Sequence, residues 1–208
     1  MEYIDMNSWR RKEHFAFFHA LDYPQFNVCV NLDITHFLAF VKENKLSFYY
    51  SMMYAACTKA NEIENFRYRI RDGRVVLHEK ADPSFTDITP GDDLFKYVTA
   101  ELTGDMLHFT DLAREASRKK TYYMPDPEDE KRDDLIYITC LPLIAFTSIS
   151  NAIHMHADDS IPRFSWGKYF EENGRVLLPF SVQVNHALAD GLQVGQYINS
   201  LQNYLDIQ

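Results

Sequence analysis

Two kinds of hydrophobic spacing alternate along this chain, and their alternation restricts the folds open to it. Residues 26–32 place Phe, Val, Val and Leu at every second position, which is typical of a strand with one buried face. The next segment changes to helical spacing, with Phe37 and Val41 on one face after a start at Asp33 or Thr35. Because such changes recur with mostly short connections, the pattern predicts an α/β fold, a two-layer sandwich with a large mixed sheet.

The same rules place the remaining elements. The expected helices cover residues 9–21, 47–61, 104–120 and 191–205, and the expected strands cover 66–70, 74–77, 84–88, 94–102 and parts of 135–150 and 163–186. Asp72-Gly73 and Asn173-Gly174 mark tight turns between strands. The charged segment 125–134 is interpreted as a solvated connection. We see no repeat and no linker, and we therefore expect one domain over residues 1–208.

The composition limits the kinds of partner that this chain is expected to bind. A chain with 46% hydrophobic residues can bury its own core, and its net charge of −9 makes nucleic acid an unexpected partner. No apolar run reaches the roughly 18 residues of a membrane span, so no membrane is expected. Cys29, Cys57 and Cys140 lack metal-ligand spacing, and residues 1–5 show no secretory signal. These features predict reduced thiols in the cytoplasm.

The segment from Asn185 to Gly191 is the strongest candidate for chemistry. His186 ends an apolar strand-like run and stands four residues before Asp190, which precedes the last helix. Imidazole titrates near neutral pH, so His186 is a candidate general base; the alternative is a core histidine bonded to the backbone. Asp190 is expected to orient His186, to cap the helix, or to pair with an arginine.

Two other groups offer weaker chemistry. The hydroxyl of Ser148 is able to stabilise an oxyanion, but no Gly-x-Ser-x-Gly turn supports a Ser-His-Asp hydrolase. His154 and His156 precede two aspartates and form the most metal-like cluster, yet no further histidine and no glutamate base accompany them. We therefore interpret this cluster as a surface turn and expect no metal. The 7 glycines form no phosphate-binding loop.

Several of these pieces occur in the order found in one family. Over about residues 5–205 the chain resembles the trimeric chloramphenicol acetyltransferases, which are built around a His-x-x-x-Asp-Gly motif. The segments that carry the resemblance are Trp9-Arg10-Arg11-Lys12 with Phe15, Leu32-Asp33-Ile34-Thr35, Phe146-Thr147-Ser148, Gly167-Lys168-Tyr169, Leu178-Pro179 and His186-Ala187 with Asp190-Gly191.

The resemblance implies an acetyl-CoA-dependent O-acetyltransferase. In this reading His186 takes the proton of an acceptor hydroxyl, and the alkoxide attacks the thioester of acetyl-CoA in one ternary complex. Ser148 stabilises the tetrahedral oxyanion. Arg11 pairs with Asp190 to hold the backbone around the histidine, so Asp190 is structural and no proton relay. Acetyl-CoA is then a co-substrate, and no bound cofactor is expected.

The resemblance also implies how the co-substrate is bound. Ser165 occupies the position of a threonine that assists the transition state through water, and Lys168 and Tyr169 match positions near the CoA nucleotide. The family's sites lie between subunits, which implies a homotrimer.

Some positions depart from the family pattern. The motif is preceded by Asn185 in place of a histidine, Ala189 replaces a cysteine, and Leu192 and Gln193 replace Phe and His. The changed positions belong to the expected acceptor pocket, so the acceptor is chloramphenicol or another small molecule carrying a hydroxyl. The alternatives are the catalytic core of a dihydrolipoyl acyltransferase and a trimeric binding protein without turnover.

Overall fold

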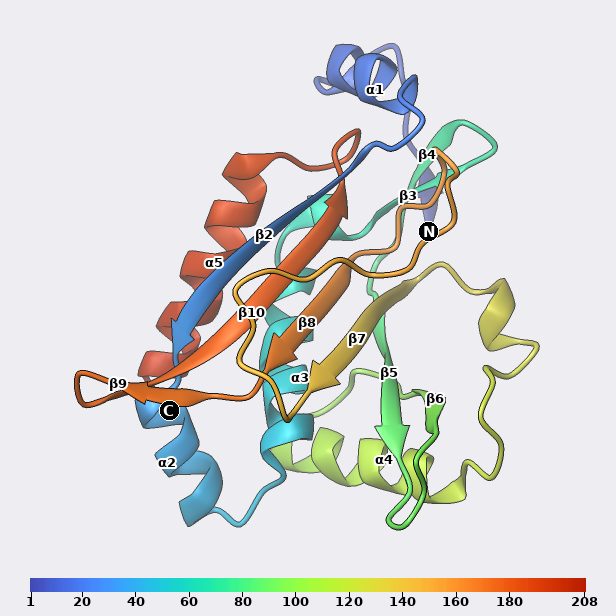
Figure 1. Ribbon diagram of the computed structural model, residues 1–208. Coiled ribbons are helices and arrows are strands. Elements are labelled where there is room, and N and C mark those ends of the chain that lie inside the picture. The colour runs from blue at the N-terminus through green and yellow to red at the C-terminus, as the bar shows by residue number, and fades with distance from the viewer.

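The computed structural model describes residues 1–208 and forms a mixed sheet with helices packed behind it (Figure 1). The helices are α1 (Lys12–His19), α2 (Thr35–Glu43), α3 (Phe48–Asn61), α4 (Met106–Lys119) and α5 (Gly191–Asp206), with short 3-10 turns at Glu64–Phe66 and Asp129–Lys131. The strands are β1 (Glu2–Tyr3), β2 (Gln25–Asp33), β3 (Tyr68–Arg71), β4 (Arg74–Leu77), β5 (Asp82–Ile88), β6 (Phe95–Thr99), β7 (Leu135–Leu141), β8 (Arg163–Gly167), β9 (Phe170–Glu172) and β10 (Arg175–Asn185).

The large sheet has the strand order β2-β10-β8-β7-β5-β6, and β9 pairs with β10. Strand β7 runs parallel to β5 and β8, whereas the other pairs are antiparallel, so the sheet is mixed as the sequence predicts. A smaller sheet, β1-β4-β3, stands near α1 at one end of the molecule (Figure 1). The two-layer α/β architecture predicted from the sequence is confirmed.

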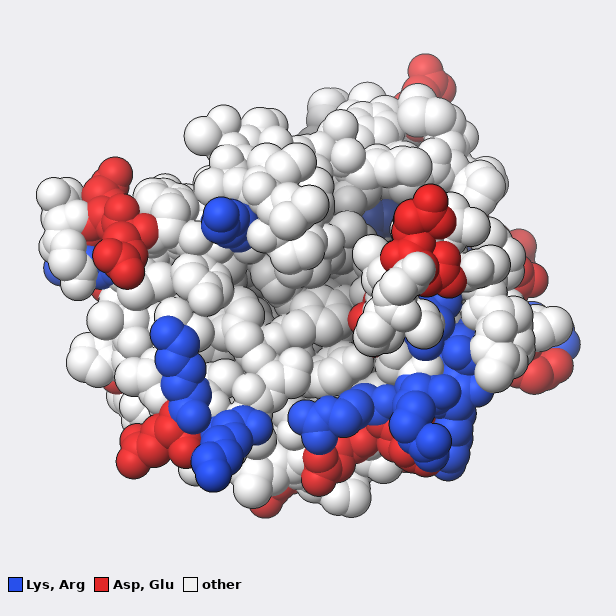
Figure 2. Space-filling view, turned by 60° about the horizontal axis from the view of Figure 1, so that its bottom comes forward, with Lys and Arg blue, Asp and Glu red and all other residues white.

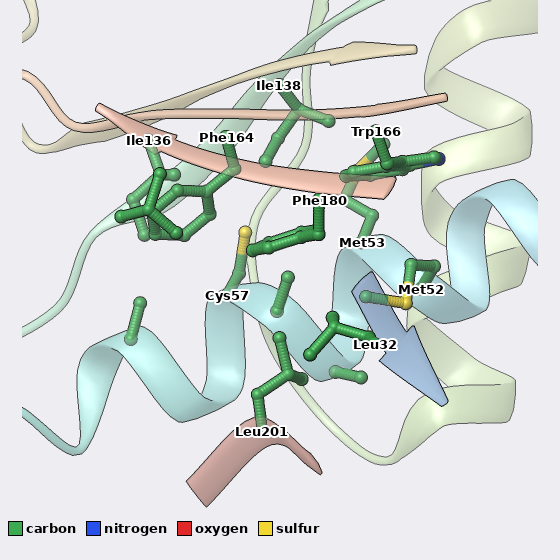
Figure 3. Close-up of a cluster of buried hydrophobic side chains, with 14 of the residues drawn as sticks. Leu32, Met52, Met53, Cys57, Ile136, Ile138, Phe164, Trp166, Phe180 and Leu201 are labelled. Atoms are coloured by element: carbon green, nitrogen blue, oxygen red, sulfur yellow. The ribbon is translucent and has the colours of Figure 1, made fainter. Parts of the chain in front are cut away.

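The core lies between the large sheet and the helices behind it. In Figure 3 the side chains of Phe164, Trp166 and Phe180 point from the strands toward Met52, Met53 and Cys57, and all six are less than 2% exposed. Because strand residues alternate between faces, the polar residues of β10 point to the opposite face. Ser181, Gln183 and Asn185 are nevertheless buried there. The cover on that face is a long loop, residues 142–162, which crosses the front of the sheet in Figure 1.

Both predicted tight turns form, and their backbone explains the residues found there. Asp72 and Gly73 have φ angles of 51° and 69°, and Asn173 and Gly174 have angles of 50° and 78°. Two successive residues with positive φ are the requirement of a two-residue hairpin turn, and Asp-Gly and Asn-Gly tolerate that region best. The first turn joins β3 to β4, and the second joins β9 to β10.

Two element boundaries differ from the sequence prediction. The first helix begins at Lys12 and not near Trp9, because Asp5 accepts hydrogen bonds from the backbone of Asn7 and the hydroxyl of Ser8 and holds residues 5–9 in turns. The strand expected across residues 135–150 ends at Leu141. Proline follows at position 142 and has no N–H for a ladder, so the chain leaves the sheet there.

The charged segment 125–134 is only partly the solvated connection predicted. At its end, Arg132 forms ion pairs with Asp82 and Asp134, and Asp133 pairs with Arg71. Burial alone would raise the pKa of Asp133, but hydrogen bonds from Arg71 and His78 outweigh burial and hold this pKa well below its usual range. This end of the segment therefore fastens the small sheet to the start of β7.

Charged side chains of both signs are mixed on the end of the molecule shown in Figure 2. Lys and Arg gather in the lower part of that view beside Asp and Glu, around a hollow with mostly uncharged walls. Along α4 the cations have close acidic neighbours: Arg114 lies 2.9 Å from Asp111, and Arg118 lies 2.8 Å from Glu115. The positive charge of this helix is thus locally compensated. None of the helices is long and apolar enough to cross a membrane.

Candidate active site

His186 stands on a tight turn between the last strand and the last helix. Its backbone N–H donates to the carbonyl of Pro24 at 2.6 Å, and the turn that follows is closed by bonds from Leu188 and Ala189 N–H to the carbonyl of Asn185. Leu188 and Ala189 are almost fully buried. The end of β10 and the start of α5 therefore fix the backbone on both sides of His186.

Arg11 binds this turn from the N-terminal segment. Its guanidinium donates to the carbonyls of His186 and Ala187, each at 2.9 Å, and to the carboxylate of Asp190, also at 2.9 Å. The side chain of Arg11 is only 12% exposed. Three acceptors in one plane suit the fork of a guanidinium, and a lysine ammonium would not reproduce that geometry.

Asp190 combines two of the roles left open by the sequence. One carboxylate oxygen accepts from Arg11, and the other accepts from the N–H of Leu192 at the start of α5. Gln193 completes a capping box by accepting from the N–H of Asp190. Burial raises the pKa of Asp190, but the hydrogen bonds from Arg11 and Leu192 outweigh it, so the pKa lies below its usual value. The carboxylate is held in its charged form.

The imidazole of His186 is held by aromatic rings. It stacks on Phe18 of α1 with 3.8 Å between ring centroids and an interplanar angle of 6°, and it lies 4.5 Å from the ring of Phe26. Its Nδ1 is buried and has no hydrogen-bond partner. Nε2 is therefore the nitrogen that remains available to a ligand.

Ser148 is not brought into contact with His186 within one chain. Its side chain is exposed and forms no hydrogen bond, and the neighbouring carbonyl of Ile149 accepts from the Asn27 side chain at 2.7 Å. Successive strand residues point to opposite faces, so Asn27 faces the loop while Phe26 faces the helices and His186. The two predicted reacting groups thus lie on different sides of β2.

The predicted co-substrate residues lie at the other end of the sheet. Lys168 and Tyr169 follow β8, where Lys168 N–H donates to the carbonyl of Ile144 at 2.8 Å and Tyr169 packs edge-on to Phe48 at 5.7 Å. Trp166 pairs with Phe180 in the antiparallel register, and His186 lies six residues beyond Phe180 along β10. At about 3.3 Å per residue, these six residues place His186 roughly 20 Å from Trp166, and Lys168 and Tyr169 follow Trp166 at that far end.

Ser165 has the most enclosed position of the predicted site residues. It is fully buried on the loop-covered face of β8, and its hydroxyl donates to Asn151 at 3.3 Å. The side chain of Asn151 in turn donates to Gln183 at 3.4 Å. The structure therefore groups His186, Arg11 and Asp190, but leaves Ser148, Ser165 and the Lys168-Tyr169 pair elsewhere on the sheet.

The histidine-rich turn does not gather into a metal-binding group. His154 and His156 are exposed, and Asp158 points away from them to His19, 2.7 Å from its Nε2. Asp159 is paired with Arg163. The contact between His19 and Asp158 ties the long loop to α1.

A family model described as chloramphenicol acetyltransferase matches residues 1–202. This chain belongs to the chloramphenicol acetyltransferase family. It is therefore an enzyme of the acyltransferase class.

Relatives in the chloramphenicol acetyltransferase family match nearly the whole chain. A chloramphenicol acetyltransferase of Klebsiella sp is 30% identical over 206 residues, which cover 98% of this chain and 93% of the relative. Chloramphenicol acetyltransferase 2 of Haemophilus influenzae is also 30% identical, covering 98% and 96%.

Solved structures give the same result for the acyltransferase fold. A chloramphenicol acetyltransferase structure aligns with a TM-score of 0.88 at 27% identity, covering 98% of this chain and 99% of that chain. A dihydrolipoamide acetyltransferase of Azotobacter vinelandii aligns with a TM-score of 0.70 at 17% identity, covering 100% and 92%. The second likeness shows a shared fold alone.

The aromatic support of His186 was not predicted from the sequence. Phe18 and Phe26 contact the imidazole from α1 and β2, far away in the sequence. Their apolar spacing predicted buried faces, and nothing in the pattern distinguishes a phenylalanine that packs on a histidine from one in the core. Leu192, which replaces a phenylalanine of the family pattern, is 65% exposed beside the turn.

Proposed function

We propose that this chain is a single acyltransferase domain over residues 1–208 that transfers acetyl from acetyl-CoA to a hydroxyl of chloramphenicol or a related small molecule. The observation that carries the proposal is the His186 turn, braced by Arg11 and Asp190 with Nε2 left available. The relatives named chloramphenicol acetyltransferase support both the reaction and the acceptor.

In the proposed reaction, Nε2 of His186 accepts the proton of the acceptor hydroxyl as the oxygen attacks the thioester carbonyl. The carbonyl oxygen becomes an oxyanion, and the hydroxyl of Ser148 donates to it. When the intermediate collapses, the C–S bond breaks, CoA leaves as the thiol, and the proton on His186 goes to the leaving sulfur. No acyl-enzyme forms. Asp190 stays ionised and acts through Arg11 on the backbone of His186.

We further propose that the site is shared between copies of the chain in a closed homotrimer. Ser148 does not contact His186 within one chain, and the Lys168-Tyr169 pair lies at the opposite end of the sheet. In a ring of three copies each contact joins two different surfaces, so the His186 end of one copy is able to meet the Ser148 segment of the next. Lys168 and Tyr169 would then bind the nucleotide of acetyl-CoA, and Ser165 would hold a water near the reacting atoms.

The test is release of the CoA thiol from acetyl-CoA with chloramphenicol, beside a panel of hydroxylated small molecules. His186→Ala should lower kcat by several orders of magnitude with the fold intact. His154→Ala is the matched control, because His154 stands at the same spacing from an aspartate but is exposed. Release only with another acceptor would replace the substrate and keep the mechanism. No release with any acceptor, or near-normal turnover by His186→Ala, would overturn the proposal.

A further inference from the structure

Asn185, the last residue of β10, uses its whole side chain to join two segments. It is 2% exposed. Its Nδ2 donates to the carbonyls of Ala157 and Asp159, each at 3.0 Å, and its Oδ1 accepts from the N–H of Ala187 at 3.0 Å. Both amide hydrogens and the amide oxygen therefore have partners. The side chain links the long loop to the backbone that follows His186.

Asn185 holds the turn around His186 through two groups, its main-chain carbonyl and its side-chain amide. Its main-chain carbonyl accepts from Leu188 and Ala189 N–H, at 3.0 and 3.1 Å, while its side chain holds the N–H of Ala187. These bonds set the backbone direction on the C-terminal side of His186, as Pro24 does at its N–H. Arg11 acts on the carbonyls of the same turn from outside.

The imidazole itself has no hydrogen bond that would fix it independently. Its Nδ1 has no partner, and its other restraints are the rings of Phe18 and Phe26. These ring contacts limit tilting of the imidazole, but they include no hydrogen bond that would fix the position of Nε2. The position of Nε2 therefore follows the backbone of residues 185–187.

We propose that Asn185 is a positioning residue for His186, which it serves by clamping the backbone on the C-terminal side of the base to the carbonyls of Ala157 and Asp159. This inference rests on the proposed function, because it supposes that His186 is the base. Few residues could replace the amide. Aspartate keeps the acceptor for Ala187 but has no donor for the two carbonyls, and neutral histidine offers one donor and one acceptor. An asparagine is the side chain that satisfies all three bonds.

The test compares Asn185→Asp and Asn185→His with Gln25→Ala. Gln25 is the matched control, since its side chain donates to the same Asp159 carbonyl at 2.6 Å but does not touch the backbone that follows His186. Both Asn185 variants should lower kcat by about tenfold or more, since small misplacements of a reacting group are costly. The KM for acetyl-CoA should change by about twofold or less, and Gln25→Ala should keep kcat. Thermal unfolding of all three variants shows whether lost stability accounts for the difference.

A second measurement does not depend on turnover. The His186 Cε1–H proton resonance, assigned by its disappearance in His186→Ala, should carry an upfield ring-current shift from Phe18. That shift should decrease in both Asn185 variants and persist in Gln25→Ala. Unchanged resonances, or a kcat for the Asn185 variants equal to that of Gln25→Ala, would overturn the positioning role. If the wild-type chain transfers no acetyl group, the proposed function fails, while the resonances still decide whether Asn185 positions the ring.

Discussion

The two ends of the large sheet are built in different ways. At the His186 end, the backbone groups of residues 186–188 are held by the chain itself, through Pro24, Arg11, Asn65 and Asn185. The loop in front of the sheet leaves Ser148 exposed without a hydrogen bond, and at the other end of the sheet Tyr169 is 40% exposed. One chain thus completes the geometry of the His186 turn but leaves Ser148 and Tyr169 open to solvent.

This difference separates residues that serve the fold from residues that we propose to contact a ligand or a second copy. A group that already has its partners should affect stability when it is removed. A group without partners should affect turnover alone. Substitutions at the two places are therefore expected to divide cleanly between unfolding and kinetic measurements.

Among the substitutions that distinguish these two regions, Ser148→Ala is expected to have the largest effect. Loss of an oxyanion donor raises the barrier by about 3–4 kcal/mol, so Ser148→Ala should lower kcat several-hundred-fold. Its melting temperature should match the wild type, because the hydroxyl has no partner in the chain. Ser150→Ala, two residues away and also exposed, is the control for kcat and should behave as wild type. A large loss of stability in Ser148→Ala would remove the distinction between the two regions.

Arg11→Ala, unlike Ser148→Ala, should reduce the stability of the fold. It leaves Asp190 and two turn carbonyls without their donor, and breaking such a partly buried pair costs about 3 kcal/mol of unfolding free energy. The kcat should fall as well, because the backbone of His186 loses a brace. Urea unfolding measures the first effect. Arg10→Ala is the control, since Arg10 is exposed and forms no ion pair; equal stability of the two variants would contradict the bracing role.

Gly167→Ala tests how the long loop meets the end of β8. A Cβ at this position would collide with the carbonyl of Ile144 and press on the Phe146 ring, so the loop must shift. We expect a loss of about 1–3 kcal/mol in unfolding free energy and a several-fold higher KM for acetyl-CoA, because Lys168 is hydrogen-bonded to the same carbonyl. Gly195→Ala in α5 meets open space and should not destabilise the protein. An unchanged KM in Gly167→Ala would argue against co-substrate binding there.

The smallest expected effect is the loss of stability at the His186 end when the pH is lowered. The folded-state pKa of Asp190 lies below its usual value, so ionised Asp190 stabilises the fold above about pH 4, and this contribution disappears as the pH falls through the folded-state pKa. Asp190→Asn should therefore lower the free energy of unfolding at pH 7 by on the order of 1 kcal/mol. The variant should also lose less stability than the wild type when the pH is lowered. Exposed Asp93→Asn is the control in urea unfolding at pH 7 and pH 3. A difference between wild type and Asp190→Asn that is the same at both pH values would contradict this role.

The sequence predicted the fold well because its signals are local. Alternation along β2 and β10, helical spacing from Phe37 to Val41 and the Asp72-Gly73 turn each depend on neighbouring residues. Its failures involve distant partners. The ion pair between Asp133 and Arg71 depends on how separate elements meet, which spacing does not encode.

At the candidate site, too, contacts between distant segments were not predicted from residue spacing. Proximity of Arg11 and Asp190 was implied by resemblance, and the contact is present at 2.9 Å. The stacking of Phe18 on His186 and the three bonds of Asn185 were not predicted, since they join segments far apart in the sequence. The roles of Ser148, Ser165, Lys168 and Tyr169 remain predictions, because they concern groups that one chain does not bring together.

The most direct test of the shared site is activity in mixed oligomers of His186→Ala and Ser148→Ala chains, co-expressed with different tags and purified through both. Each variant alone should be nearly inactive. If His186 of one copy works with Ser148 of the next, mixed trimers should recover about a third of the wild-type rate, since in a closed ring of three that contains both variants one of the three neighbour pairs carries both intact residues. Mixed oligomers that assemble but stay as inactive as their parents would show that both residues act from the same chain.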